Sequence, residues 1–122
     1  MAINAHAGSA TWKSNPVSTD WSVAVNWMPE TVPDCDSCVA TFGTSALPQV
    51  ELFGNNNTPL TETVARITFT PGSSAYTITA HSFGALNFDG AGIVNQSGIQ
   101  QNFKAEREAG SMGVGQFFFS KG

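Results

Sequence analysis

The chain carries very little charge. Only 11% of its 122 residues are Asp, Glu, Lys or Arg, against about 25% in typical soluble proteins. Five basic residues against nine acidic ones give a net charge of −4. Binding to nucleic acid requires a Lys/Arg footprint on the phosphates, and binding to an anionic membrane surface requires basic residues as well. The composition therefore predicts a protein with neither kind of partner.

Long apolar runs are also missing. No stretch approaches the ~20 apolar residues that a membrane-spanning helix needs, so we expect no membrane insertion. Ala5-His6-Ala7 has the small-x-small form of a signal-peptidase site, but the positive and apolar regions that normally precede such a site are absent. We expect residues 1–10 to be a disordered N-terminal segment.

The constellations of most enzymes are absent from the sequence. It has no Ser/His/Asp set and no glycine-rich phosphate loop, and residues 65–103 contain only one acid, Asp89, and one base, Arg66. A glycosidase needs two positioned carboxylates. His6 and His81 lack the spacing of metal ligands, and His81 reads as a solvated turn residue. We therefore predict no enzymatic activity, no catalytic residues, no metal site and no cofactor.

What the sequence does contain is a series of short runs with apolar residues at alternate positions. This period of two is typical of half-buried strands. Clusters of Gly, Pro, Ser, Asn and Asp at residues 71–74, 89–92 and 96–98 predict turns between the runs. Residues 104–109 form the only helix-like stretch. The alternating apolar residues are Ile67 and Phe69, Tyr76 and Ile78, Leu86 and Phe88, and Ile99 and Phe103.

A weak internal repeat accompanies these runs. Ile67-Thr68-Phe69 recurs nineteen positions later as Leu86-Asn87-Phe88, and Phe103 and Phe119 follow at intervals of fifteen and sixteen. Spacings of this order are typical of a β-solenoid, in which each coil stacks on the previous one. An antiparallel β-sandwich or jelly roll is the alternative all-β fold, although no Asn-Gly or Asp-Gly hairpin joins strands of matched length.

Three tryptophans, Trp12, Trp21 and Trp27, lie in an irregular, loop-rich segment. We expect a single β-rich domain over residues 11–122, with a capping segment at 11–49 and β rungs at 50–122. The tryptophans are expected to be buried and to cap one end of the core. The alternative is that they form a stacking platform that binds carbohydrate.

Cys35 and Cys38 frame the motif Cys-Asp-Ser-Cys. Asp34 and Asp36 flank the first thiol and disfavour its thiolate, and a strand-like sequence follows where a redox motif needs a helix. We expect a local disulfide between Cys35 and Cys38 if the protein is exported, and two free thiols otherwise.

Two blocks of the sequence together resemble the passenger regions of bacterial autotransporters and related secreted repeat proteins, over about residues 10–120. The resemblance implies a right-handed parallel β-helix with a Trp-rich entry module. Cys35 and Cys38 depart from the family pattern, and the chain stops where further rungs are expected. The first block comprises Ala10-Thr11-Trp12, Asn26-Trp27-Met28-Pro29, Thr31-Val32-Pro33 and Ala40-Thr41-Phe42, and the second Ala75-Tyr76-Thr77-Ile78 and Gly92-Ile93-Val94-Asn95-Gln96-Ser97-Gly98.

Three consecutive aromatics, Phe117, Phe118 and Phe119, stand close to the C-terminus. A half-buried strand cannot hide all three on one face, so we expect them to form an oligomer interface. Together these observations predict a non-enzymatic structural or adhesive module of a secreted or cell-surface protein. Such a module would contact surface glycans or host matrix, and a carbohydrate-binding module is the alternative function.

Overall fold

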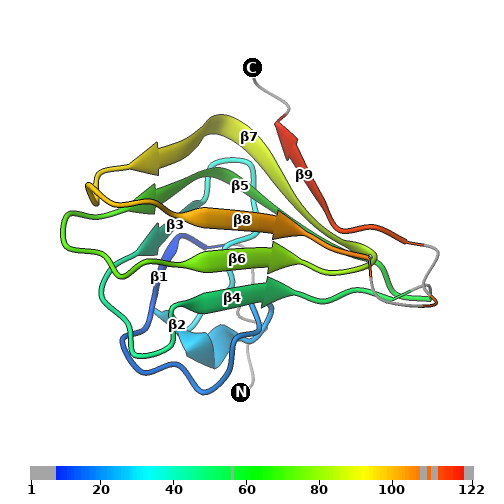
Figure 1. Ribbon diagram of the computed structural model, residues 1–122, viewed down its shortest axis with the longest axis horizontal. Helices are drawn as coiled ribbons and strands as arrows, with labels where there is room; N and C mark the ends of the chain where they lie inside the picture. The colour runs from blue at the N-terminus through cyan, green and yellow to red at the C-terminus, as the bar shows by residue number, and fades with distance from the viewer. Residues whose placement is uncertain (1–7, 56, 108–109, 111–112, 120–122) are drawn as a thin grey trace.

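The computed structural model describes residues 8–55, 57–107, 110 and 113–119. It is an all-β structure, a parallel β-solenoid of about four turns, with its strands in two facing layers (Figure 1). One layer is a six-stranded sheet in the order β2-β1-β3-β5-β7-β9, and the other is a three-stranded sheet in the order β4-β6-β8. The predicted solenoid is therefore confirmed, and the sandwich alternative is wrong.

The chain alternates between the two layers as it climbs the solenoid. Within the described residues every strand pairing is parallel except the antiparallel pair of β1 and β2. The elements are β1 (Ala10–Trp12), a short 3₁₀ helix η1 (Ala24–Asn26), β2 (Trp27–Met28), β3 (Val39–Phe42), β4 (Gln49–Leu52), β5 (Leu60–Phe69), β6 (Thr77–Ala80), β7 (Gly84–Asn95), β8 (Asn102–Ala105) and β9 (Gln116–Phe119).

The core lies between the layers and contains a continuous series of aromatic contacts. Ring centroids lie 5.6 Å apart from Trp27 to Phe42, 5.6 Å from Phe42 to Phe69, 6.1 Å from Phe69 to Phe103 and 5.5 Å from Phe103 to Phe117. Edge and offset contacts at these distances add to the stability that apolar burial provides. The series runs from the first turn of the solenoid to the last.

The true repeat differs from the one that the sequence suggested. Val64 stacks on Phe88 and Leu86 on Phe117, so that one turn takes between 24 and 31 residues. Phe88 and Phe103 belong to different sheets. The predicted intervals of fifteen and sixteen were wrong because they joined residues of opposite layers. The interval of nineteen joined Ile67 and Leu86, which lie in the same sheet but do not pair: Ile67 pairs with Ile93 and Leu86 with Glu62.

The cluster at residues 89–92 is not a turn. It lies inside β7, where the register against β5 shifts between Val64 and Arg66. Gly92 has φ +84, and a Cβ on Gly90 would lie only 2.8 Å from the Ala65 carbonyl oxygen. These glycines therefore build a β-bulge that bends a long strand.

Three segment boundaries in the structure differ from those predicted from the sequence. Residues 8–10 are ordered, since Gly8 donates to the Val32 carbonyl and Ala10 begins β1; residues 1–7 lie outside the described part. Parallel pairing begins with β1 and β3, before residue 50, so the cap is smaller than residues 11–49. The first two residues of the predicted helix-like stretch at 104–109 belong to strand β8. Their pairing with β6 overrides the local helix propensity of the sequence.

Candidate functional site

The three tryptophans are almost completely buried: Trp12 is 2% exposed, and Trp21 and Trp27 are 0% exposed. Each indole N–H finds a backbone carbonyl: Trp12 donates to Leu47, Trp21 to Pro33 and Trp27 to Trp21. They pack at the β1–β2 end of the core, as expected of a cap. No ring face is left for a sugar, so the predicted ligand site on Trp12, Trp21 and Trp27 is wrong.

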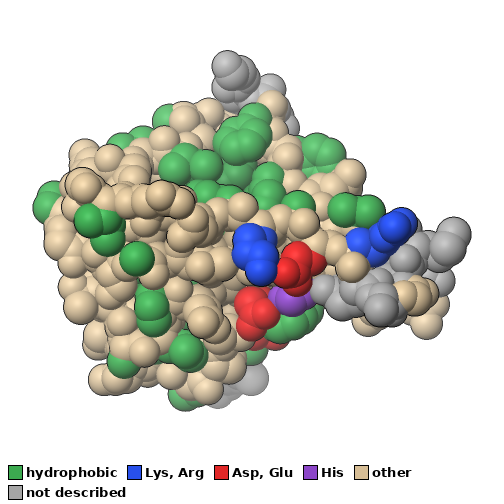
Figure 2. Space-filling model, in the orientation of Figure 1, with side chains coloured by type: hydrophobic (Ala, Val, Ile, Leu, Met, Phe, Trp, Pro, Cys, Tyr) green, Lys and Arg blue, Asp and Glu red, His purple; other side chains and the backbone are tan. Residues whose placement is uncertain are grey.

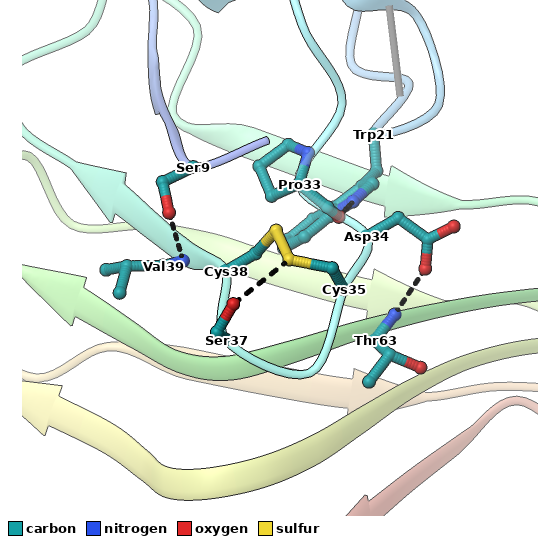
Figure 3. The surroundings of a disulfide bond; sticks show 9 residues. All are labelled: Ser9, Trp21, Pro33, Asp34, Cys35, Ser37, Cys38, Val39 and Thr63. Carbon is teal, nitrogen blue, oxygen red and sulfur yellow. Dashed lines mark hydrogen bonds between the residues drawn. A yellow bond between two sulfur atoms is a disulfide. The ribbon is translucent and has the colours of Figure 1, made fainter. Parts of the chain in front are cut away.

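Cys35 and Cys38 form the expected disulfide. Figure 3 shows it beside Pro33, whose carbonyl accepts from Trp21, and beside Asp34, whose carboxylate accepts from the Thr63 amide at 2.9 Å. Cys38 is 2% exposed and belongs to the core cluster. The disulfide therefore fixes the loop that leads from the tryptophan cap into β3.

At the opposite end of the solenoid, which we call the open end, no described residues form a cap over β8 and β9. Phe117 is partly buried, whereas Phe118 and Phe119 are exposed. Phe119 stacks on Phe88 with centroids 4.6 Å apart, so one of its faces is packed and the other is not. These residues lie on an edge strand with apolar surface to cover, as the sequence predicted, but their role in an interface stays a prediction.

Glu62 is a buried acid that the sequence analysis did not single out. It lies on β5 in the alternating series of inward-facing residues, one position before Thr63, and its Oε1 atom has no hydrogen-bond partner in the described part of the chain. Burial, followed by the nearby negative charges of Asp34 and Asp20, raises the pKa of Glu62 to about 8. This carboxyl is therefore protonated at neutral pH.

A second polar cluster lies on the outer face of the three-stranded sheet. His81 Nε2 lies 2.6 Å from Glu51 Oε1, and His81 Nδ1 lies 3.4 Å from Glu106 Oε1. Lys104 Nζ contacts Glu106 Oε2 at 2.9 Å. The Phe53 ring stacks on the imidazole with centroids 4.7 Å apart. His81 is therefore not the solvated turn residue that the sequence suggested.

Figure 2 shows acidic, basic and histidine side chains gathered in one place over this sheet, on a face that is otherwise mostly uncharged. Sequence reasoning missed the cluster because its members come from three successive turns. Glu51 and His81 lie 30 residues apart, and only the register of β4, β6 and β8 brings them together. The one signal in the sequence was alternation, which places Glu51 and Lys104 on the solvent side of β4 and β8. Thr79, which is 7% exposed, lies between them in the register.

Within the described residues, no three or more His, Cys, Asp or Glu side chains are grouped so as to hold a metal ion. The same part of the chain contains no helix with the length and apolar character needed to cross a bilayer. No protein-family model matches this chain, and no curated protein or solved structure is significantly similar to it.

Proposed function

We propose that the chain is a non-enzymatic structural or adhesive module of a secreted or cell-surface β-solenoid protein, of the kind that autotransporter passenger regions exemplify. The observation that carries the proposal is that one end of the solenoid is capped by the described residues and the other is not. A tryptophan cap closes the solenoid at β1 and β2, whereas at the other end β8 and β9 are edge strands that pair with no further strand of the described residues. Such asymmetry is typical of a terminal unit in a stack of repeats.

The interior supports a scaffold role. Apolar side chains with no exposed surface occupy most inward positions of the middle turns, among them Val50, Ile67 and Ile78, and Glu62 is the buried acid among them. A solenoid packed in this way has a rigid, extended outer surface, which suits spacing or adhesion. The Cys35–Cys38 disulfide supports export, because disulfides persist in oxidising compartments.

Two measurements test this function. The oxidised protein is incubated with neutral and uronic-acid polysaccharides, and newly formed reducing ends and unsaturated products are quantified. We expect no turnover above that of heat-unfolded protein. Turnover that a Glu51→Gln/Glu106→Gln variant loses while remaining folded would contradict the proposal.

The second measurement addresses the compartment. Cells that produce the protein naturally are lysed in the presence of a thiol-alkylating reagent, and the mass of the intact protein is determined. We expect Cys35 and Cys38 to escape alkylation unless a reductant is added first. Complete alkylation without reductant contradicts export.

A further inference from the structure

The three-stranded sheet turns a regular grid of side chains outward. The register aligns Gln49, Thr77 and Asn102 in one row, and Glu51, Thr79 and Lys104 in the next. Backbone bonds from His81 to the Leu52 carbonyl and from Glu106 to the Ala80 carbonyl continue the pattern, which places Phe53, His81 and Glu106 in a third row. Much of this grid lines an open groove of about 360 Å³.

The charged members of the grid are held in place by one another. Glu51 accepts from His81 and also from the Thr19 hydroxyl. Glu106 lies between His81 and Lys104. Side chains restrained in this way lose little conformational freedom when a ligand arrives, which lowers the cost of binding.

The neutral members have hydrogen-bonding capacity to spare. Across the described ranges, the hydroxyls of Thr77 and Thr79 and the amide of Gln49 form no side-chain hydrogen bond. All three residues line the groove, Thr79 with only 7% of its surface exposed. Lys104 uses one of its three N–H groups on Glu106. At the edge of the grid the Phe53 ring is 46% exposed and provides an apolar surface.

We propose that this groove binds an uncharged oligosaccharide. A sugar presents many hydroxyls and an apolar face of C–H groups, and the grid offers acceptors, donors and an aromatic surface at the regular intervals of paired strands. Two carboxylates against one lysine and one histidine leave the groove without the net positive charge that would attract an anionic ligand. The two ring nitrogens of His81 face different carboxylates, an arrangement that does not converge on a metal ion.

This inference rests on the proposed function, since it names the ligand class of an adhesive module. The experiment is calorimetric titration of the folded protein with soluble glucan, mannan and xylan oligosaccharides and with oligogalacturonate as the anionic probe. We expect binding to at least one neutral series and none to oligogalacturonate. Absence of binding to all neutral series, or a preference for oligogalacturonate, overturns the proposal.

A Thr77→Val/Thr79→Val variant locates the site. Valine preserves side-chain shape and strand propensity but removes both hydroxyls, so affinity is expected to fall at least tenfold while the unfolding midpoint stays close to the wild-type value. Thr41→Val removes an outward hydroxyl from β3 in the other sheet and should leave affinity unchanged. Equal weakening in both variants, or in neither, places the ligand elsewhere and overturns the assignment.

If the double threonine variant fails to fold, a Gln49→Leu variant tests the same groove at an exposed position, and its affinity for the neutral oligosaccharide is expected to fall as well. The titrated samples are also analysed for shortened oligosaccharides. Binding without cleavage supports both proposals, whereas cleavage contradicts the non-enzymatic function alone. Lack of binding contradicts the glycan groove alone.

Discussion

At the scale of single residues, Glu62 is the clearest conflict between sequence and environment. It occupies an inward position on β5 where alternation calls for an apolar side chain, and it is 1% exposed. A carboxylate in such a place is costly unless it is paired. The protein meets this cost by protonation, since the pKa of Glu62 is raised to about 8, against 4.5 for the ordinary group.

This shift predicts how stability depends on pH. Below about pH 4.5 Glu62 is protonated in both the folded and the unfolded chain, and its contribution is fully present. As pH rises, the unfolded chain loses the proton first, so stability falls until about pH 8, where the folded state ionises too. Between pH 5 and pH 8 this one group should cost about 3 kcal/mol, at roughly 1.4 kcal/mol per pH unit.

The substitution Glu62→Gln removes the ionisable group and keeps its size. Relative to wild type, the free energy of unfolding of the variant should rise by about 3 kcal/mol between pH 5 and pH 8, measured by denaturant unfolding at both values. Glu30→Gln is the matched control, because Glu30 is an exposed partner of Lys13 and its loss should preserve the wild-type slope. A Glu62→Gln slope equal to that of wild type contradicts the prediction.

At the scale of elements, the cap determines whether the first turn of the solenoid is stable. Trp27 lies at the start of β2 and contacts Trp12, Trp21 and Phe42 at centroid distances of 4.9–5.6 Å. Its indole N–H donates to the Trp21 carbonyl at 2.9 Å. One side chain therefore links the capping loop to the first parallel strands.

Replacing Trp27 with alanine should destabilise the protein by about 3–5 kcal/mol, because it leaves a large cavity and an unpaired carbonyl. The measurement is chemical unfolding followed by circular dichroism. Met28→Ala is the control: Met28 is the next residue of the same strand and is 61% exposed, so its truncation should cost less than about 0.5 kcal/mol. A loss below 1 kcal/mol for Trp27→Ala would show that the cap is dispensable.

At the scale of the whole molecule, burial declines toward the open end. Ile67 is fully buried, but its neighbour in the next turn, Ile93, is 38% exposed; Phe88 is 1% exposed, and the Phe119 that stacks on it is 57% exposed. Equivalent positions are therefore buried in the middle turns and exposed in the last turn, where no further strand of the described residues covers them. Together with the open edges of β8 and β9, this surface favours pairing with another chain.

We therefore predict self-association. The cap blocks head-to-tail stacking, so two open ends are expected to meet about a two-fold axis. Light scattering over the micromolar range should show a mass that rises toward twice the monomer value. Phe119→Glu should keep the protein monomeric. Val17→Glu, at a residue that is 70% exposed and precedes the cap strand β2, should not. A wild-type protein that stays monomeric at every concentration contradicts the prediction.

The sequence by itself determined the fold class and the composition of the core. Period-two alternation depends only on the geometry of an extended backbone, so Ile67, Phe69, Ile78, Leu86 and Phe88 could be placed inside without knowledge of their partners. The nearness of Cys35 and Cys38 likewise requires no long-range information. Ile99 was misplaced, being 45% exposed, because it lies in the connection before β8.

The tertiary structure alone decided which residues of different turns are neighbours. The repeat of 24 to 31 residues, the bulge at Gly90 and Gly92, and the grouping of Glu51, His81 and Glu106 all depend on the register between strands of different turns. Register is a property of pairs of strands and of the loops that join them. Because these loops vary in length from turn to turn, no single stretch of sequence records the register, and the outer groove becomes visible only when the turns are stacked.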